Sequence, residues 1–206
     1  MSIQLQELKK FNFIFILAIL FFQNTYGQNK TYKDSLLSYQ QNYINTHEVV
    51  GKDDRKYIHF YTVDESYRVT ASFERINDAK GFDMNTASGM KQKYFHYGHL
   101  TFKLHDSLIH LYIYQSASLM KQKKYKDYLF VPFGDVTSGF ESYGGGRYLD
   151  CTISGIKKSQ LILDFNKAYN LYCAYTAGYN CPIPPKENLL SVSIPAGEKN
   201  YGKPVH

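Results

Sequence analysis

Residues 94–114, YFHYGHLTFKLHDSLIHLYIY, decide the fold class. Leu100, Phe102 and Leu104 recur at every second position, which is the period of a strand with one buried face. Asp106 and Ser107 then supply a turn, after which an apolar run returns from Leu108 to Tyr114. The stretch therefore predicts an antiparallel β-hairpin.

Similar short runs lie on both sides of this hairpin. Ile58 and Phe60 precede the turn signal Asp64-Glu65-Ser66, and an alternating run from Tyr67 to Phe73 follows it, which predicts another hairpin. Further β-rich runs occupy residues 128–133, 148–153, 160–165 and 189–194. Because no helical pattern separates these runs, we expect a mainly β chain. The expected architecture is a single antiparallel β-barrel or β-sandwich of about nine strands with a short N-terminal helix.

The N-terminal residues predict export. Lys9 and Lys10 precede an apolar run of 12 residues, Phe11–Phe22, and polar or small residues follow to Gly27. We interpret residues 1–27 as a secretory signal peptide, with an uncleaved anchor as the alternative. Because 12 residues are too few for a comfortable membrane span, no stable span is expected once the signal is removed. The mature protein would be periplasmic or extracellular.

A short helix is expected after the signal. Asp34 is positioned to cap it, and Leu36, Tyr39, Tyr43 and Ile44 then form one stripe at helical spacing through about Asn45. We therefore divide the chain into the signal at 1–27, a helix and connector at 28–56, and an all-β domain at 57–206.

Composition and charge narrow the class of protein. The 206 residues are 44% hydrophobic and 17% aromatic, with 20 Tyr and no Trp, which excludes fibrous and low-complexity classes. The net charge of +6 falls to +5 when residues 1–27 are removed, because two lysines and one glutamate leave with them. Lys121, Lys123, Lys124 and Lys126 form a solvated loop or an anion-binding surface. Export argues against nucleic acid, so the expected partner is an unknown small molecule or an anionic surface. The oligomeric state stays open.

The C-terminal third carries several separated motifs in one order. They are YGGGRYLD at 143–150, LDFNKAYN at 163–170, CAY at 173–175, CPIPPKENLL at 181–190 and AGEK at 196–199. In these motifs the chain resembles the bacterial and archaeal family catalogued as domain of unknown function sixteen eighty-four. The resemblance covers roughly Tyr57 to Tyr201. The family name implies no activity, so no catalytic role follows from it.

The same region contains the candidate site residues. Arg147 follows three glycines that permit positive φ or a close backbone approach, and it lies in a stretch rich in carboxylates and amides. One interpretation is a buried structural network, since a buried guanidinium must be paired. A second is a polar loop cluster that binds a small or anionic ligand. Its candidate residues are Asp135, Glu141, Tyr143, Gly145, Arg147, Asp164 and Asn166.

Two further classes of function stay open. Glu141 and Asp164 beside Arg147 could form the acid–base pair of a hydrolase or lyase. An envelope structural or interaction protein with no pocket is the other alternative.

Cysteines and histidines complete the prediction. Cys173 and Cys181 enclose seven residues in a turn-rich stretch, which predicts a disulfide in an exported protein. Cys151 alternates with apolar neighbours and is expected in the core. On a strand His96 would face away from His99 and His105, so these side chains are interpreted as surface groups. No metal site and no cofactor motif is predicted.

Overall fold

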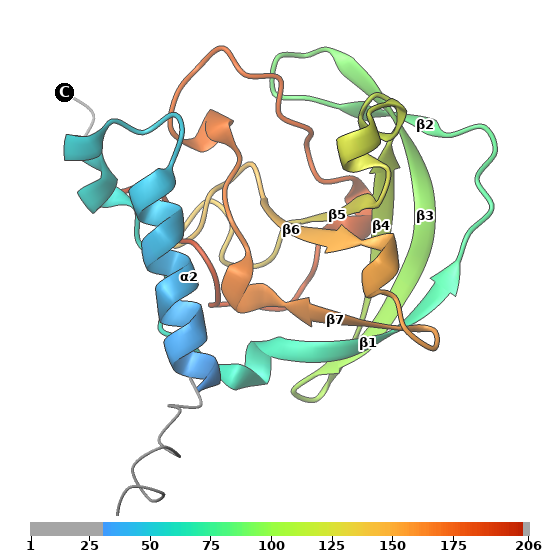
Figure 1. Cartoon of the computed structure of the whole chain (residues 1–206), viewed down its shortest axis with the longest axis horizontal. Coiled ribbons are helices and arrows are strands. Elements are labelled where there is room, and N and C mark those ends of the chain that lie inside the picture. The colour runs from blue at the N-terminus through green and yellow to red at the C-terminus, as the bar shows by residue number, and fades with distance from the viewer. Residues whose placement is uncertain (1–30, 204–206) are drawn as a thin grey trace, which may run out of the picture. The chain divides into compact units, whose positions relative to one another are not determined.

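The computed structural model describes residues 31–203 of the chain (Figure 1). Contacts separate the described residues 36–203 from residues 31–35. The fold below is that of the larger unit. The predicted signal peptide at residues 1–27 lies outside the described residues.

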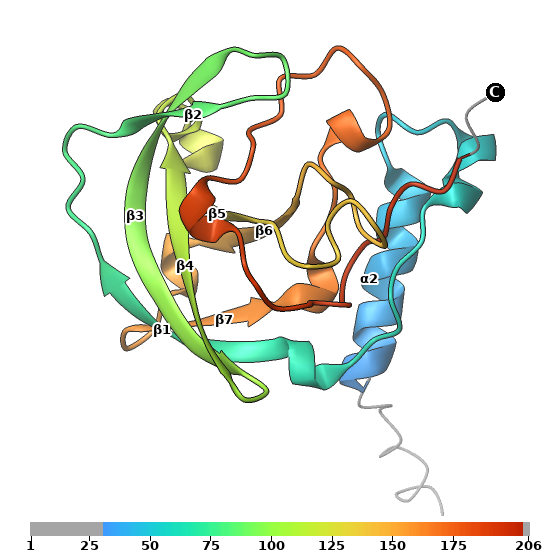
Figure 2. The same ribbon diagram turned by 180° about the vertical axis from the view of Figure 1, so that it is seen from behind.

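One antiparallel sheet of seven strands forms this unit, in the order β6-β5-β4-β3-β1-β7, with β2 paired to β3. The sheet curves around until its two end strands, β6 and β7, approach each other (Figures 1 and 2). The prediction of a mainly β, barrel-like antiparallel fold is therefore confirmed. The strands are β1 (Arg68–Arg75), β2 (Phe82–Asn85), β3 (Lys91–Leu104), β4 (Ser107–Ser116), β5 (Tyr128–Phe133), β6 (Arg147–Thr152) and β7 (Gln160–Asp164).

The predicted central hairpin is β3 and β4. Leu104 pairs with Ser107 across the turn, and the ladder continues to Tyr94 and Ser116. Its alternating apolar residues face the interior, where Leu100 and Leu111 are completely buried. Together with residues from β1, β5, β6 and β7, they form the main hydrophobic cluster inside the curved sheet.

The expected number of nine strands is wrong. Residues 57–61 and 189–194 form no strand and make only isolated bridges, Phe60 to Glu198 and Leu189 to Gly134. Their alternation reflects burial instead, since Ile58 is 3% exposed and Ile194 is 0% exposed. The sequence interpretation also missed β2, because it is only four residues long and half polar.

The N-terminal helix α2 (Tyr32–Thr46) is present, but Asp34 does not cap it. The helix begins two residues earlier, and the Oγ1 of Thr31 accepts a hydrogen bond from the Asp34 backbone N–H at 3.1 Å. Thr31 Oγ1 in turn donates to the Asp34 carboxylate at 2.6 Å. The pair therefore resembles a capping box, with Thr31 as the capping residue and Asp34 in the first turn.

Asn188 joins β4 to β5 where their ladder is incomplete. These strands share one pair of facing residues, Tyr114 and Phe130. The fully buried Asn188 accepts from the Tyr112 backbone N–H at 2.7 Å and donates to the carbonyls of Tyr112 at 2.9 Å and Pro132 at 2.7 Å. Because proline has no N–H to offer a neighbouring strand, the amide side chain supplies hydrogen bonds that the backbone cannot.

Replacing Asn188 with Ala is expected to lower the free energy of unfolding by about 2–4 kcal/mol, because the N–H and carbonyl of Tyr112 and the carbonyl of Pro132 lose their partner. Urea denaturation followed by circular dichroism measures this loss. The control is Asn85→Ala at an exposed strand position, which should cost less than about 0.5 kcal/mol. Equal midpoints for the two variants would show that Asn188 does not stabilise the β4–β5 junction.

Candidate functional site

Arg147, at the start of β6, is completely buried. Its Nη2 donates to Asp135 Oδ1 at 2.9 Å, to Thr137 Oγ1 at 3.3 Å and to the Ile194 carbonyl at 2.8 Å, and its Nη1 donates to the Ala196 carbonyl. Asp135 also accepts from the Ile194 backbone N–H at 2.7 Å. The ion pair and its hydrogen bonds therefore connect the loop before β6 to the C-terminal segment that contains Ile194 and Ala196.

The glycines before Arg147 allow a close backbone approach. Gly146 has φ +86°, and a Cβ at this position would lie 2.8 Å from the Phe133 carbonyl oxygen and also against Pro184. The carbonyl of Gly145 accepts from the Tyr148 hydroxyl at 3.3 Å. Tyr143 is half-buried, and a Cβ on Gly145 would meet its ring. The space beside Gly145 and Gly146 is therefore occupied by the side chains of Tyr143 and Pro184.

The other predicted site residues lie in separate hydrogen-bonded groups. Glu141 is exposed and accepts from the Tyr61 hydroxyl at 3.1 Å. Asp164 ends β7 and accepts from the Asn166 backbone N–H at 3.2 Å, while buried Asn166 bonds to the backbone of Asp64. Arg147 makes no hydrogen bond to Glu141 or Asp164. The acid–base pair beside Arg147 stays a prediction that these contacts do not support.

Cys173 and Cys181 form a disulfide, as the sequence predicted. Cys151 is the free cysteine of the described chain and is buried in the main core cluster. Burial raises the pKa of its thiol to about 12. The thiol is therefore protonated at neutral pH and unreactive.

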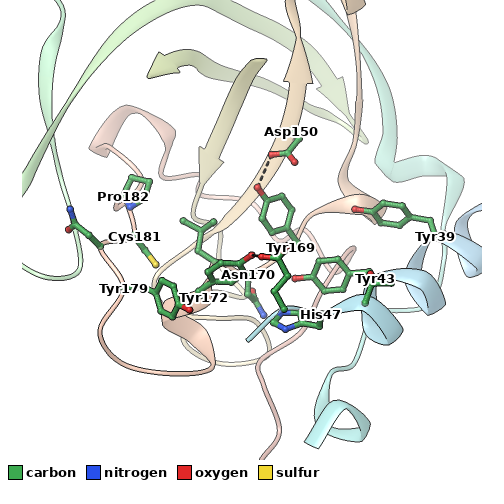
Figure 3. Close-up of a pocket in the computed structure, with 14 residues that line it drawn as sticks. Tyr39, Tyr43, His47, Asp150, Tyr169, Asn170, Tyr172, Tyr179, Cys181 and Pro182 are labelled. Carbon is green, nitrogen blue, oxygen red and sulfur yellow. Dashed lines mark hydrogen bonds between the residues drawn. The ribbon is translucent and has the colours of Figure 1, made fainter. Parts of the chain in front are cut away.

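A cavity of about 540 Å³ opens between α2, the end of β6 and the segment that contains the disulfide (Figure 3). Its size falls within the range of small-molecule sites. Five tyrosines, two carboxylates and a histidine are among its lining residues, and none of the lining residues is Lys or Arg. The lining consists of Tyr39, Tyr43, Thr46, His47, Glu48, Asp150, Tyr169, Asn170, Leu171, Tyr172, Tyr179, Asn180, Cys181 and Pro182.

Both carboxylates of the cavity accept hydrogen bonds from tyrosine hydroxyls. Tyr169 donates to Asp150 Oδ1 at 2.7 Å, and Tyr128 donates to the same oxygen at 2.8 Å. Tyr172 donates to Glu48 Oε2, and this hydrogen bond is the main reason that the pKa of Tyr172 is raised to about 12. Burial raises the pKa of Tyr169 well above its usual value. These hydroxyls therefore keep their protons at neutral pH and act as donors to the carboxylates.

Two polar atoms in the cavity wall are buried without a partner. His47 is 5% exposed; its Nδ1 accepts from the Val50 backbone N–H at 3.1 Å, which assigns the ring proton to Nε2. Asn170 is 1% exposed, and its Nδ2 donates to the Lys199 carbonyl at 2.8 Å. His47 Nε2 and Asn170 Oδ1 have no hydrogen-bond partner. Gln40 Nε2 and Arg147 Nε, which do not belong to this lining, are buried without a partner as well. Burying such an atom costs about 1–3 kcal/mol.

Glu198 lies directly behind the cavity wall and is fully buried. It accepts hydrogen bonds from the hydroxyls of Tyr175 at 2.5 Å and Tyr43 at 3.2 Å and from the Asn170 backbone N–H at 2.8 Å. Burial raises the pKa of this carboxyl to about 7, although the three donors act in the opposite direction. Glu198 therefore connects α2 to the segment that forms the far wall of the cavity.

A second cavity of about 500 Å³ lies where β6 and β7 approach each other. It shares Tyr39, Asp150 and Tyr169 with the first cavity, and Arg68, Asp164 and Lys167 also line it. Asp164 is thus the one predicted site residue that lines a described cavity, and it is not in the same cavity as the unpartnered atoms.

The sequence interpretation missed the residues of the larger cavity. Tyr39 and Tyr43 on α2 and His47 just after it follow one another at four-residue spacing. The predicted packing stripe included the two tyrosines but not His47. Glu198 lies in the AGEK motif, where nothing in the local pattern indicates a buried carboxylate. The helical spacing of tyrosines and a histidine is the one local signal that could have identified this wall.

The histidines at 96–110 lie in separate contacts within residues 31–203. His99 stacks on His110, while His96 contacts Asp78 and Glu187. In this part of the chain no three side chains of metal-binding type are grouped to hold an ion. Nor does any of its helices have the length and apolar character needed to cross a membrane.

Replacing Arg147 with Met should lower the free energy of unfolding by about 3–5 kcal/mol, because Asp135 would remain buried without its cation. Adding Asp135→Asn to this variant should recover part of the loss. Denaturant titration of the single and double variants measures the coupling. If Arg147→Met is as stable as the wild type, the network is not structural, and the predicted ligand-binding role of Arg147 gains support.

The raised pKa of Glu198 predicts a pH-dependent stability. Between the usual pKa of 4.5 and the folded value of about 7, the unfolded chain loses its proton first, so rising pH favours unfolding. Wild-type stability should therefore fall relative to Glu198→Gln from pH 5 to 8, by on the order of 3 kcal/mol. Thermal unfolding across this range measures the difference, with Glu65→Gln as an exposed control. Parallel curves for wild type and Glu198→Gln would refute the assignment.

Comparisons with known proteins agree with the motif resemblance. The solution NMR structure of an uncharacterised protein from Haloarcula marismortui superposes with a TM-score of 0.60 at 28% identity, covering 80% of this chain and 92% of that one. No curated protein matches the chain. The model of the family described as "Protein of unknown function (DUF1684)" matches residues 54–199, most of the chain. The chain therefore belongs to this family.

Proposed function

We propose that the protein is an exported, single-domain protein that binds a small molecule in the tyrosine-lined cavity. The observation that carries the proposal is the pair of buried, unpartnered atoms, His47 Nε2 and Asn170 Oδ1, in the wall of a cavity of about 540 Å³. Tyrosine rings and a few fixed polar groups are the usual lining of such sites.

Two features support export. Residues 1–27 have the basic, apolar and polar segments of a secretory signal. The disulfide Cys173–Cys181 is of the kind that persists in oxidising compartments. It also closes the segment that supplies Tyr179 and Asn180 to the cavity.

The cluster around Arg147 is a weaker candidate for ligand binding. Its guanidinium already donates to four acceptors of the protein and has no exposed surface. A ligand would have to displace these contacts and open the loop before β6. The hydrolase hypothesis is weaker still, because Glu141 and Asp164 lie in separate hydrogen-bonded groups.

Tyr179→Ala should weaken ligand binding about tenfold or more while the fold is retained, because this ring is 40% exposed and lines the cavity. Ligand-observed NMR against a fragment library, with protein purified after export, first identifies binders. Dissociation constants for wild type and variant are then compared.

The matched control for this experiment is Phe140→Ala, since Phe140 is 83% exposed and does not line the cavity. It should bind every fragment as the wild type does. The proposed function would be contradicted if no fragment binds, or if the dissociation constants of the fragments that bind are the same for Tyr179→Ala and wild type.

A further inference from the structure

We propose that the ligand of this cavity is a small organic cation, a molecule that carries a protonated amine or a guanidinium group. This inference rests on the proposed function and names the chemical class that the same site would select.

The first argument is the direction of the hydrogen bonds. A tyrosine hydroxyl has one proton, and in Tyr169 and Tyr172 that proton is donated to Asp150 and Glu48. The hydroxyl oxygens can therefore only accept a further hydrogen bond. Asp150 Oδ2 and Glu48 Oε1 have no hydrogen bond within the described structure, so they are acceptors as well. These acceptor oxygens of Tyr169, Tyr172, Asp150 and Glu48 favour a ligand rich in N–H donors.

The second argument comes from the unpartnered atoms. Asn170 Oδ1 is one more acceptor, and it is buried where water reaches it poorly. His47 Nε2–H is a buried donor without a partner, and the Tyr179 hydroxyl and the Asn180 amide group can donate as well, so these groups suit acceptor atoms elsewhere on the ligand. Of the four buried atoms without a partner in residues 31–203, these two belong to cavity-lining residues, and neither is part of an acidic side chain.

The third argument is charge. The cavity has two carboxylates at its surface and no Lys or Arg among its lining residues, although the whole chain has a net charge of +6. His47 does not compensate them, because its Nδ1 accepts a hydrogen bond from Val50 and burial lowers its pKa. Arg68 and Lys167 lie on the far side of Asp150, in the lining of the second cavity, so an anion in the first cavity would meet its two carboxylates and no lining cation. A cation would form charge-assisted hydrogen bonds with both carboxylates.

The tyrosine rings add to this preference. The rings of Tyr172 and Tyr179 lie 5.0 Å apart, centroid to centroid, beside the carboxylates. The negative face of an aromatic ring attracts an ammonium or guanidinium group. The protein shows the same contact nearby, where the Lys167 ammonium lies 5.6 Å from the centre of the Tyr39 ring. A neutral sugar could also donate hydrogen bonds, but it would leave both carboxylates without a counter-charge.

The test uses agmatine and 1,4-diaminobutane as cationic probes, with 1,4-butanediol, succinate and methyl glucoside as neutral and anionic comparisons. Isothermal titration of the exported protein at low salt should show saturable binding of the two cations. Their binding should weaken as salt increases, because exposed charges are screened. The three comparison compounds should bind at least tenfold more weakly.

Asp150→Asn provides the matched variant. Asparagine retains an oxygen that can accept from Tyr128 and Tyr169, so the variant removes the charge while keeping that acceptor. It should weaken binding of agmatine about tenfold or more. Asp106→Asn, in the β3–β4 turn, makes the same chemical change away from the cavity and should leave the dissociation constant unchanged.

The possible results separate the two proposals. If a neutral or anionic compound binds and Tyr179→Ala weakens it, the cavity is a binding site but the cationic class is wrong. If the cationic probes fail to bind, or bind Asp150→Asn as tightly as the wild type, the inference is likewise overturned. If neither these probes nor any fragment responds to Tyr179→Ala, the proposed function fails as well.

Discussion

The ion pair between Arg147 and Asp135 is the contact on which the rest of the structure depends. A guanidinium with no exposed surface must be surrounded by acceptors, and here they come from the loop before β6 and from the backbone of Ile194 and Ala196. Neither segment is part of a regular ladder that would otherwise hold it. The buried charge thus determines where the C-terminal segment crosses the interior of the curved sheet.

Both sides of this network lead to the tyrosine-lined cavity. Asp150, which lies three residues after Arg147 on β6, lines the cavity. Glu198, which lies two residues after Ala196, accepts a hydrogen bond from Asn170 in the cavity wall. Glu198 then positions Asn170 and Tyr43. The molecule therefore contains one polar centre that is sealed from solvent and a second that is open to it. Arg147 Nε is unpartnered in the first, and His47 Nε2 and Asn170 Oδ1 belong to the wall of the second. The second also has two carboxylates and no Lys or Arg in its lining, as expected of a site for a cationic ligand.

The sequence predicted those features that depend on local patterns. The hairpin of β3 and β4 follows from period-two alternation around a turn, and the need to pair Arg147 follows from its chemistry. The same alternation wrongly predicted strands at 57–61 and 189–194. A segment that buries every second side chain shows this pattern even when it has no continuous partner strand. The sequence alone could not indicate which carboxylate pairs with Arg147, since Asp135 and Glu141 are both near Arg147 along the chain. The cavity combines α2, β6 and the disulfide segment, and no spacing within one segment encodes such an assembly.

The most direct test of this account is to follow the side-chain signals of His47 and Asn170 by ¹⁵N NMR while agmatine is added. The account predicts that the Nε2 signal of His47 and the side-chain amide of Asn170 move together along one saturable curve, because both residues line the cavity. Unchanged signals at both residues, while agmatine binds elsewhere or does not bind, would contradict it.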